Sequence, residues 1–151
     1  MKRFFTVLGG ITAALVVLAA AAIFLAKYFR VDLDQESKSY VDANLPPIVG
    51  TWNPEELIKR SSPEFLQVTP PDKIEKLFGI LSQRLGPLKE YRGSRGRSKE
   101  LMIGAEEVIT GDYKAEASFA NGPAQIDCRV IKHDGQWQIL EFWVDSNGGP
   151  P

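Results

Sequence analysis

The chain begins with a long apolar stretch, and its hydrophobic pattern changes twice afterwards. Residues 4–26 contain no charged side chain. A helix over these positions reaches about 34 Å, which is enough to cross a hydrocarbon core of about 30 Å. Residues that anchor helix ends at a membrane interface flank the stretch on both sides: Lys2, Arg3, Lys27, Tyr28 and Arg30. The pattern predicts a single transmembrane helix within residues 1–30.

A cleaved secretory signal is the alternative for this segment, because Ala20 and Ala22 are small residues of the kind that precede a cleavage site. The apolar stretch continues to Ala26, however, and exceeds the apolar core of a signal, which is about 7–15 residues long. We therefore favour an uncleaved anchor. Basic residues nearly balance across the stretch, and acidic residues follow from Asp32 onward. We expect the N-terminus inside and the following domain on the extracytoplasmic, periplasmic side.

Apolar residues then recur at three- and four-residue spacing, which predicts a helix that opens at Asp34. Its buried face would consist of Tyr40, Val41, Leu45, Ile48 and Val49. Pro46 and Pro47 interrupt this pattern, and a proline inside a helix removes a backbone hydrogen bond. We expect a kink or a break before Trp52.

Three further helix starts follow, each with proline in the first turn: Asn53-Pro54, Ser62-Pro63 and Pro70-Pro71. The last of these helices carries an apolar stripe of Ile74, Leu77, Phe78 and Leu81. Gly86-Pro87 is expected to end it.

From Leu88 onward the pattern alternates with a period of two residues, which predicts strands. We expect them at residues 88–91, 101–103, 111–120, 125–130 and 136–145, with a loop at residues 92–98 and turns at Asn121-Gly122 and Asp134-Gly135. Helices followed by antiparallel strands indicate an α+β domain over residues 34–146, with helices packed on a curved, cone-like antiparallel sheet. Residues 147–151 are expected to form a disordered tail.

Composition excludes several classes of protein. The chain of 151 residues has one cysteine and one histidine, so we predict no intrachain disulfide, no metal site and no cofactor. No glycine-rich nucleotide-binding motif occurs. The net charge is −1, and four of the 18 basic residues precede Val31, so the rest of the chain has 14 bases against 19 acids and carries −5. This balance argues against a nucleic-acid partner.

Several short motifs stand out in the region after the anchor: Trp52-Asn53-Pro54-Glu55-Glu56-Leu57, Ser62-Pro63-Glu64, Leu85-Gly86, and Asp134-Gly135-Gln136-Trp137-Gln138-Ile139 with Phe142, Val144 and Ser146. On these residues the region from Asp34 to Ser146 resembles the nuclear transport factor 2-like superfamily, the cystatin-like α+β cones that include ketosteroid isomerase relatives. It looks most like small bacterial members that carry a signal or an anchor. The resemblance implies a sheet and helices that enclose a pocket, and no particular reaction.

Glu141 is the most informative polar residue of the last predicted strand. If that strand pairs regularly after the Asp134-Gly135 turn, Glu141 lies opposite Cys128 and faces the core, where an unpaired carboxylate could serve as a general base. A β-bulge near Leu140 would instead turn Glu141 outward and bring Phe142 inward. The spacing of the apolar residues favours the bulge.

A second pair of carboxylates, Glu116 and Asp127, would lie opposite each other if Asn121-Gly122 formed a strict two-residue turn. That register would also oppose Lys114 to Arg129, and two like-charge pairs in one ladder are unfavourable. A shift of two residues gives Glu116–Arg129 or Lys114–Asp127 pairs, which we favour. Pro123 lacks an N–H and favours a longer loop.

Other candidates are residues of three kinds. Aromatic side chains that could line a pocket or simply fill the core are Tyr113, Phe119, Trp137, Phe142 and Trp143. Basic residues that could hold an anion or a lipid headgroup, or simply solvate a hairpin loop, are Arg92, Arg95 and Arg97. His133 beside a turn is expected to face solvent, and Cys128 to be a small core residue.

Three hypotheses about function follow. The first is a membrane-anchored, non-enzymatic module that binds a small apolar ligand or a partner protein, with Tyr113, Phe119, Trp137, Glu141 and Trp143 as the binding residues. The second is a ketosteroid isomerase-like lyase or isomerase with Glu141 as base and Tyr113 as a polarising donor. The third is an interaction subunit that forms homodimers through Trp143 and the last strand.

Overall fold

The computed structural model describes residues 2–146, and it describes the side chains of residues 12–28 and 32–146. The predicted tail at residues 147–151 and the side chains of three predicted interface anchors, Lys2, Arg3 and Arg30, lie outside this part. The chain divides into two compact units, Met1–Leu33 and Asp34–Pro151. The second unit holds the α+β domain.

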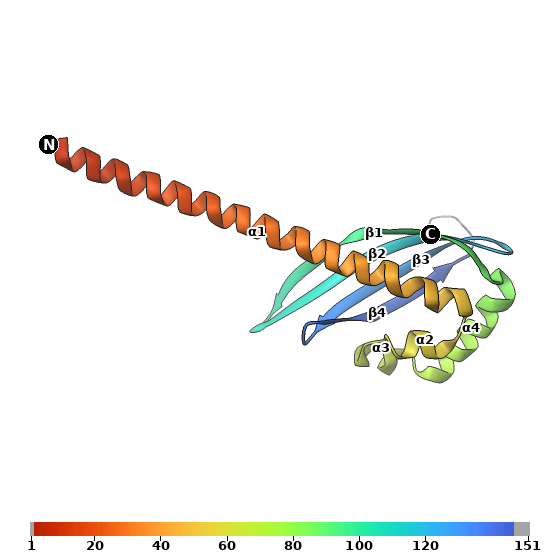
Figure 1. Cartoon of the computed structure of the whole chain (residues 1–151). Coiled ribbons are helices and arrows are strands. Elements are labelled where there is room, and N and C mark those ends of the chain that lie inside the picture. Colours follow the sequence, from red (N-terminus) through yellow and green to blue (C-terminus); the bar gives the residue numbers. More distant parts are fainter. Residues whose placement is uncertain (1, 147–151) are drawn as a thin grey trace. The chain divides into compact units, whose positions relative to one another are not determined.

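The domain contains four helices and four strands in the order expected from the sequence (Figure 1). The helices are α1 (Lys2–Thr51), of which the part from Asp34 belongs to this unit, α2 (Pro54–Ile58), α3 (Pro63–Val68) and α4 (Pro71–Leu85). The strands are β1 (Leu88–Ile103), β2 (Glu106–Phe119), β3 (Gly122–His133) and β4 (Gln136–Asp145). The strands form one curved antiparallel sheet in the order β1-β2-β3-β4, so the α+β prediction is confirmed.

Helix α1 continues through Pro46 and Pro47 and ends only at Thr51, so the prolines do not break it as one of our alternatives expected. The chain leaves the helix at Trp52, whose φ of 49° is left-handed. The apolar side chains around the two prolines, Leu45 and Ile48, are 0% exposed. Burial of this face outweighs the lost backbone bonds.

The short helices α2 and α3 begin as the sequence predicts. The side chain of Asn53 accepts a hydrogen bond from the Glu55 N–H at 3.1 Å, and that of Ser62 accepts one from the Phe65 N–H at 3.3 Å. Helix α4 starts at Pro71 without a side-chain cap and ends at Gly86, whose φ is 73°.

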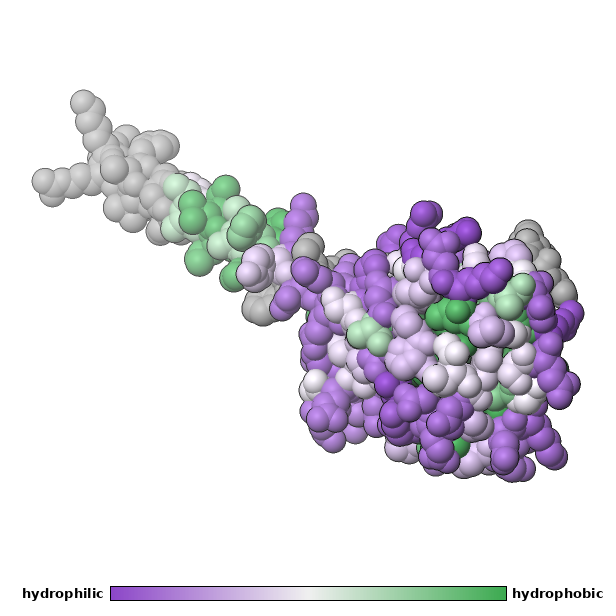
Figure 2. Space-filling model, turned by 45° about the vertical axis from the view of Figure 1, so that its right-hand side comes forward, coloured by the Kyte–Doolittle hydropathy of each residue, from purple (hydrophilic) through white to green (hydrophobic). Residues whose placement is uncertain are grey.

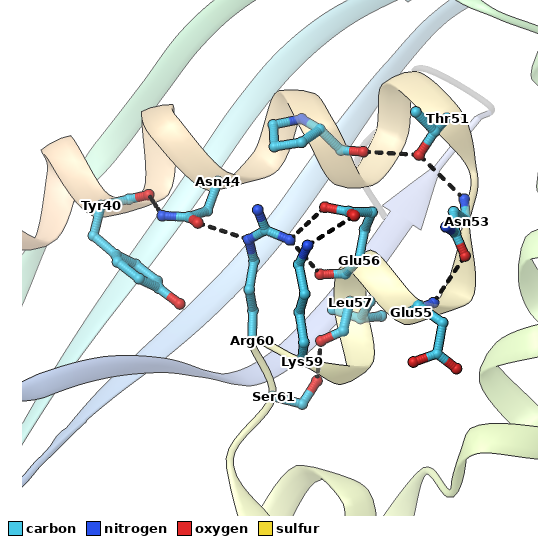
Figure 3. Close-up of polar contacts among 11 residues, drawn as sticks. Tyr40, Asn44, Thr51, Asn53, Glu55, Glu56, Leu57, Lys59, Arg60 and Ser61 are labelled. Carbon is cyan, nitrogen blue, oxygen red and sulfur yellow. Dashed lines mark hydrogen bonds and ion pairs between the residues drawn. The ribbon is translucent and has the colours of Figure 1, made fainter.

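Arg60, just after α2, ties that helix to α1 (Figure 3). Its Nε donates to Asn44 Oδ1 at 2.6 Å, and its NH1 group donates to the carboxylate and the carbonyl oxygen of Glu56, both at 2.7 Å. The side-chain amide of Asn44 donates in turn to the carbonyl oxygen of Tyr40 at 2.7 Å. These bonds fix the chain where it turns from α1 toward the sheet.

One long strand, β1, occupies residues 88–103, so the predicted loop at residues 92–98 is wrong. The pairing with β2 is irregular between Tyr91 and Ser94, and Gly93 has a φ of 88°. Gly93 therefore lies at a β-bulge inside the strand, whereas the sequence pattern predicted it in a loop. Pairing with β2 then continues in register to Ile103.

The two predicted turns have different outcomes. Asp134 and Gly135 have φ values of 50° and 77° and join β3 to β4 through a two-residue turn between His133 and Gln136, as predicted. The turn predicted at Asn121-Gly122 is instead formed by Ala120 and Asn121, because Gly122 already pairs with Phe119.

The longer loop that we inferred from Pro123 is therefore wrong, since Pro123 lies inside β3 opposite Ser118. The lack of an N–H is tolerated there because pairing between β3 and β4 begins only at Gln125, so this end of β3 has a strand on one side alone.

The helices cover one face of the sheet, and this covered face is the core. Trp52 stacks on Phe119 with ring centroids 5.5 Å apart, and Phe78 of α4 lies edge-on to Trp52 at 5.5 Å. Ile126 and Val130 of β3 are 0% exposed. The opposite face of the sheet, which we call the open face, carries the polar residues of the alternating strands.

Candidate binding groove on the open face

A β-bulge in β4 sets the direction of Glu141. Arg129 pairs with Glu141 whereas Val130 pairs with Ile139, so Leu140 is the extra residue. Glu141 is exposed and Phe142 is 7% exposed in the core. The predicted bulge is confirmed, and the alternative in which Glu141 faces the core is wrong.

The edge of β4 is covered just beside this bulge. The segment between α2 and α3 makes a parallel bridge with the strand, in which the Ile139 N–H donates to Arg60 O at 2.7 Å and the Ser62 N–H donates to Ile139 O at 2.8 Å. Helix α3 follows at once, and its Glu64 contacts His133 at 2.9 Å. Helix α3 thus borders the open face at β4.

A row of alternating charges crosses the four strands on the open face. Arg97 of β1 pairs with Asp112 of β2, which pairs with Arg129 of β3, which pairs with Glu141 of β4. The Arg129 Nε donates to Asp112, and its NH1 group donates to Glu141 at 2.8 Å. Lys99 also donates to Asp112, at 3.3 Å. We call these four cross-strand residues the charged row.

The neighbouring row contains Arg95, Lys114, Asp127 and Trp143 in the same strand order. Lys114 lies 3.7 Å from Asp127, so one of the two shifted registers that we favoured is present, and Glu116 faces Gln125 instead of a second carboxylate. The acid dyad of Glu116 and Asp127 is therefore excluded.

The two rows form the floor of a groove of about 830 Å³. Phe65 and Val68 of α3 and Thr69, which follows that helix, line it together with Leu140, Glu141 and Trp143 of β4. Arg95, Arg97 and Lys99 of β1 also contribute. Two of its apolar side chains are strongly exposed, Val68 at 71% and Trp143 at 65%. The groove thus combines a charged floor with an apolar border.

The charges of the groove are not balanced. Five basic and three acidic side chains line it, which leaves two positive charges. Partial burial raises the pKa of Asp112, but hydrogen bonds from Arg129 and Lys99 outweigh this effect and hold the pKa below its ordinary value. Arg95 and Arg97 make no ion pair with any residue in the described part of the chain. Both guanidinium groups are therefore available to an anion.

The predicted site residues separate into two sets. Glu141, Trp143, Arg95 and Arg97 lie at the groove, and Tyr113 contributes to its lining from below. The Tyr113 hydroxyl, however, points toward α1, where it shares a 2.6 Å hydrogen bond with Ser37. Tyr113 and Glu141 therefore act on opposite faces of the sheet and cannot form the predicted donor and base pair.

The remaining candidates lie elsewhere. Phe119 is a core residue stacked on Trp52, and Trp137 is 8% exposed beneath the Lys132 ammonium, 5.5 Å from its ring. Arg92 donates to Glu90 and to Ser118, outside the groove. Cys128 is buried as predicted, and His133 is partly exposed beside Glu64. Within residues 12–28 and 32–146, no cluster of three metal-ligating side chains occurs.

Sequence reasoning missed the contribution of α3. Val68 ends a helix of six residues and Thr69 follows it, and nothing in the sequence of this segment indicates a link to β4. The parallel bridge at Ile139 places them, and such a pairing between distant segments leaves no periodic signal. One local signal existed: Val68 is an apolar residue between polar Gln67 and Thr69, outside the apolar face of a helix.

Comparisons with known proteins add no assignment, since no protein-family model matches the chain and no curated protein matches it. The first unit contains the only segment of the described residues that is long and apolar enough to cross a membrane, within the helix that continues from Thr12. Apolar side chains dominate the surface of that segment, whereas the face of the domain in Figure 2 is mainly hydrophilic, with separate apolar areas.

Proposed function

We propose that this protein is a single-pass, membrane-anchored binding module without catalytic activity of its own, whose groove holds an anionic ligand with an apolar portion. The placement of the domain on the extracytoplasmic side and the membership in the nuclear transport factor 2-like superfamily belong to the same proposal. The order of helices and antiparallel strands supports the resemblance.

The anchor is supported by the exposure of consecutive apolar side chains. Leu15, Val16, Val17 and Leu18 are 60%, 68%, 67% and 66% exposed, and Phe24 is 71% exposed. Four consecutive residues point to all sides of a helix, so no single packing partner could cover them. A hydrocarbon surrounding removes all of this surface from water at once.

The observation that carries the binding proposal is that one groove is lined by the exposed indole of Trp143 on β4 and by the unpaired guanidinium groups of Arg95 and Arg97 on β1. Trp143 offers an apolar face, and Arg95 and Arg97 offer charge-assisted hydrogen bonds to an anion. The isomerase alternative lacks such support, because Glu141 is exposed and paired with Arg129 at 2.8 Å instead of buried as a free base.

The experiment is an NMR titration of the full chain in lipid nanodiscs with naphthalene-2-sulfonate, an anionic aromatic probe. The indole N–H signals of the three tryptophans report separately: Trp52 donates to Gly86 O at 3.0 Å, Trp137 is buried, and Trp143 is exposed. We expect the Trp143 signal to shift with added probe while the Trp52 signal stays in place. Because the signals come from the protein, partition of the probe into lipid does not mimic binding.

Matched arginine variants complete this test. Arg97→Gln should weaken binding by about tenfold, the loss of one charge-assisted interaction. Arg92→Gln removes an equal charge outside the groove and should leave binding unchanged. An unshifted Trp143 signal, or equal effects of the two variants, would refute the groove as the binding site. Burial of Trp143 by a second copy, as in the dimer hypothesis, would instead appear as concentration-dependent sedimentation.

A further inference from the structure

The β1–β2 hairpin ends in three consecutive exposed apolar residues. Leu101, Met102 and Ile103 are 51%, 69% and 64% exposed, and they precede a turn at Gly104 and Ala105. We call residues 101–105 the hairpin tip. Successive residues of a strand point to opposite faces, so both faces of the tip are apolar and neither is covered.

The tip extends beyond the rest of the sheet. Pairing between β2 and β3 starts at Ile109, whereas β1 and β2 remain paired out to Ile103 and Glu106. The last residues of the hairpin are therefore a two-stranded ribbon with no third strand. Such a ribbon pairs its inner backbone groups, while its outer N–H and C=O groups need water or a polar interface as partner.

The contacts between α1 and β1 show in which direction the ribbon extends. Gly50 lies near the Leu88 side chain, Asp42 binds the Ser94 N–H at 2.9 Å, and Asp34 binds the Ser98 N–H at 2.6 Å. Strand β1 thus runs antiparallel to this part of α1. Beyond Ser98 the strand continues past Asp34, the residue at which the chain enters the domain.

The hairpin extends beyond Asp34 by about the length of the linker between Asp34 and the apolar stretch. Asp34 follows Arg30 by four residues, which span at most about 14 Å of extended chain. Leu101 and Ile103 lie three and five residues after Ser98, or about 10–17 Å along the strand, before the chain turns at Gly104 and Ala105. Ile103 therefore extends beyond Asp34 by about as much as a fully extended linker separates Asp34 from the expected membrane interface.

We propose that the hairpin tip is a second membrane contact, in which Leu101, Met102 and Ile103 enter the interface of the bilayer that the N-terminal helix crosses. This inference rests on the proposed anchor. Lys99 is opposed by Glu100, Glu106 and Glu107 around the tip, a net charge of −2. The contact is therefore apolar and needs no anionic lipid. It holds the domain by two points and fixes how the groove faces the membrane.

The test places the fluorophore NBD on single introduced cysteines of the full chain in phosphatidylcholine vesicles. Cys128 is buried and remains unlabelled. Met102→Cys reports on the tip, and Glu116→Cys, exposed on the open face of β2, is the matched control. We expect doxyl groups on the lipid chains to quench NBD at position 102 by at least twofold, and soluble iodide to quench it less than at position 116.

A third label distinguishes failure of the tip contact from failure of the proposed anchor. Val17→Cys lies in the anchor, and its NBD group should be quenched by doxyl lipids whether or not the tip binds. Loss of quenching at position 17 would refute the anchor, whereas quenching at position 17 without quenching at position 102 would overturn the tip contact alone. Protection from iodide at position 102 without lipid quenching would indicate a protein partner and would equally overturn it.

Lipid composition provides the final arm of the experiment. Replacing part of the phosphatidylcholine with anionic phosphatidylglycerol should not increase quenching at position 102, because the acidic residues outnumber the basic one around the tip. Quenching that appears only with the anionic lipid would contradict the apolar contact.

Discussion

Asp42 of α1 accepts a hydrogen bond from the hydroxyl group of Tyr91 in β1 at 2.8 Å, and the same carboxylate oxygen accepts one from the Ser94 N–H at 2.9 Å. Asp34, two turns earlier in α1, binds the Ser98 N–H at 2.6 Å. Strand β1 is an edge of the sheet, where unpaired N–H groups invite pairing with other chains. The two aspartates protect this edge and hold it against the helix.

Asp42→Ala should therefore destabilise the domain by about 2 kcal/mol, the cost of removing a charged acceptor from two partly buried donors. Urea unfolding of the full chain in nanodiscs, followed by tryptophan fluorescence, measures the change. Glu75→Ala on the exposed side of α4 is the control and should change the free energy of unfolding by less than about 0.5 kcal/mol. Equal effects of the two variants would show that the contact between Asp42 and β1 contributes nothing.

Acid should weaken the same contact. Partial burial raises the pKa of Asp42, but hydrogen bonds from Lys38, Ser94 and Tyr91 outweigh it and leave the pKa below its ordinary value. A lowered folded-state pKa stabilises the protein above the unfolded-state value of about 3.9. That stabilisation is lost as the pH falls through the folded-state pKa. Between about pH 5 and pH 3, Asp42→Asn should lose less stability than the wild type, and parallel pH profiles would contradict this prediction.

Gly96 is required by the close approach of β1 and β2. A Cβ atom at this position would lie 1.9 Å from the carbonyl oxygen of Asp112. Gly96→Ala should therefore shift the strand and cost about 2 kcal/mol or more. Gly79 of α4 has open space around it, so Gly79→Ala should stabilise the helix by about 0.5–1 kcal/mol. Opposite signs in thermal unfolding are the expected result.

The Tyr113 hydroxyl should contribute to stability and not to binding. It shares a 2.6 Å hydrogen bond with the buried Ser37 hydroxyl. Tyr113→Phe should cost about 1–2 kcal/mol in urea unfolding while leaving binding of the naphthalene probe unchanged. The Tyr40 hydroxyl makes no hydrogen bond with the described residues, which makes Tyr40→Phe the matched control. Loss of probe binding in Tyr113→Phe would place this hydroxyl in the groove instead.

Cys128 should resist thiol reagents in the folded protein. Burial raises the pKa of its thiol to about 12, and the residue is only 3% exposed. Ellman's reagent at pH 8 should therefore label Cys128 only after urea unfolding. Gln83→Cys on the exposed face of α4 should add one thiol that reacts at once. Rapid labelling of both thiols without urea would contradict the buried position.

Local patterns predicted most of the elements but few of the contacts that create the groove. The caps at Asn53 and Ser62 and the turn at Asp134 were predictable because each depends on neighbouring residues alone. The outward direction of Glu141 followed from apolar spacing, since Phe142 must be buried and only an extra residue at Leu140 allows it. The loop prediction for residues 92–98 is wrong because glycines and charged residues are typical of loops. This segment forms a strand because Asp34, Asp42 and β2 bind its backbone.

The amino-acid sequence alone determined which segments form helices and which form strands. It also determined that an apolar helix of membrane-spanning length precedes an α+β domain. These properties depend on side chains only a few residues apart. Only the tertiary structure decided that α3 borders β4, that Arg97, Asp112, Arg129 and Glu141 form one row, and that the hairpin tip extends past Asp34. Those relationships depend on strand register and on pairing between distant segments, the most distant being Ser61 with Ile139, and no periodic pattern in the sequence indicates which segments pair.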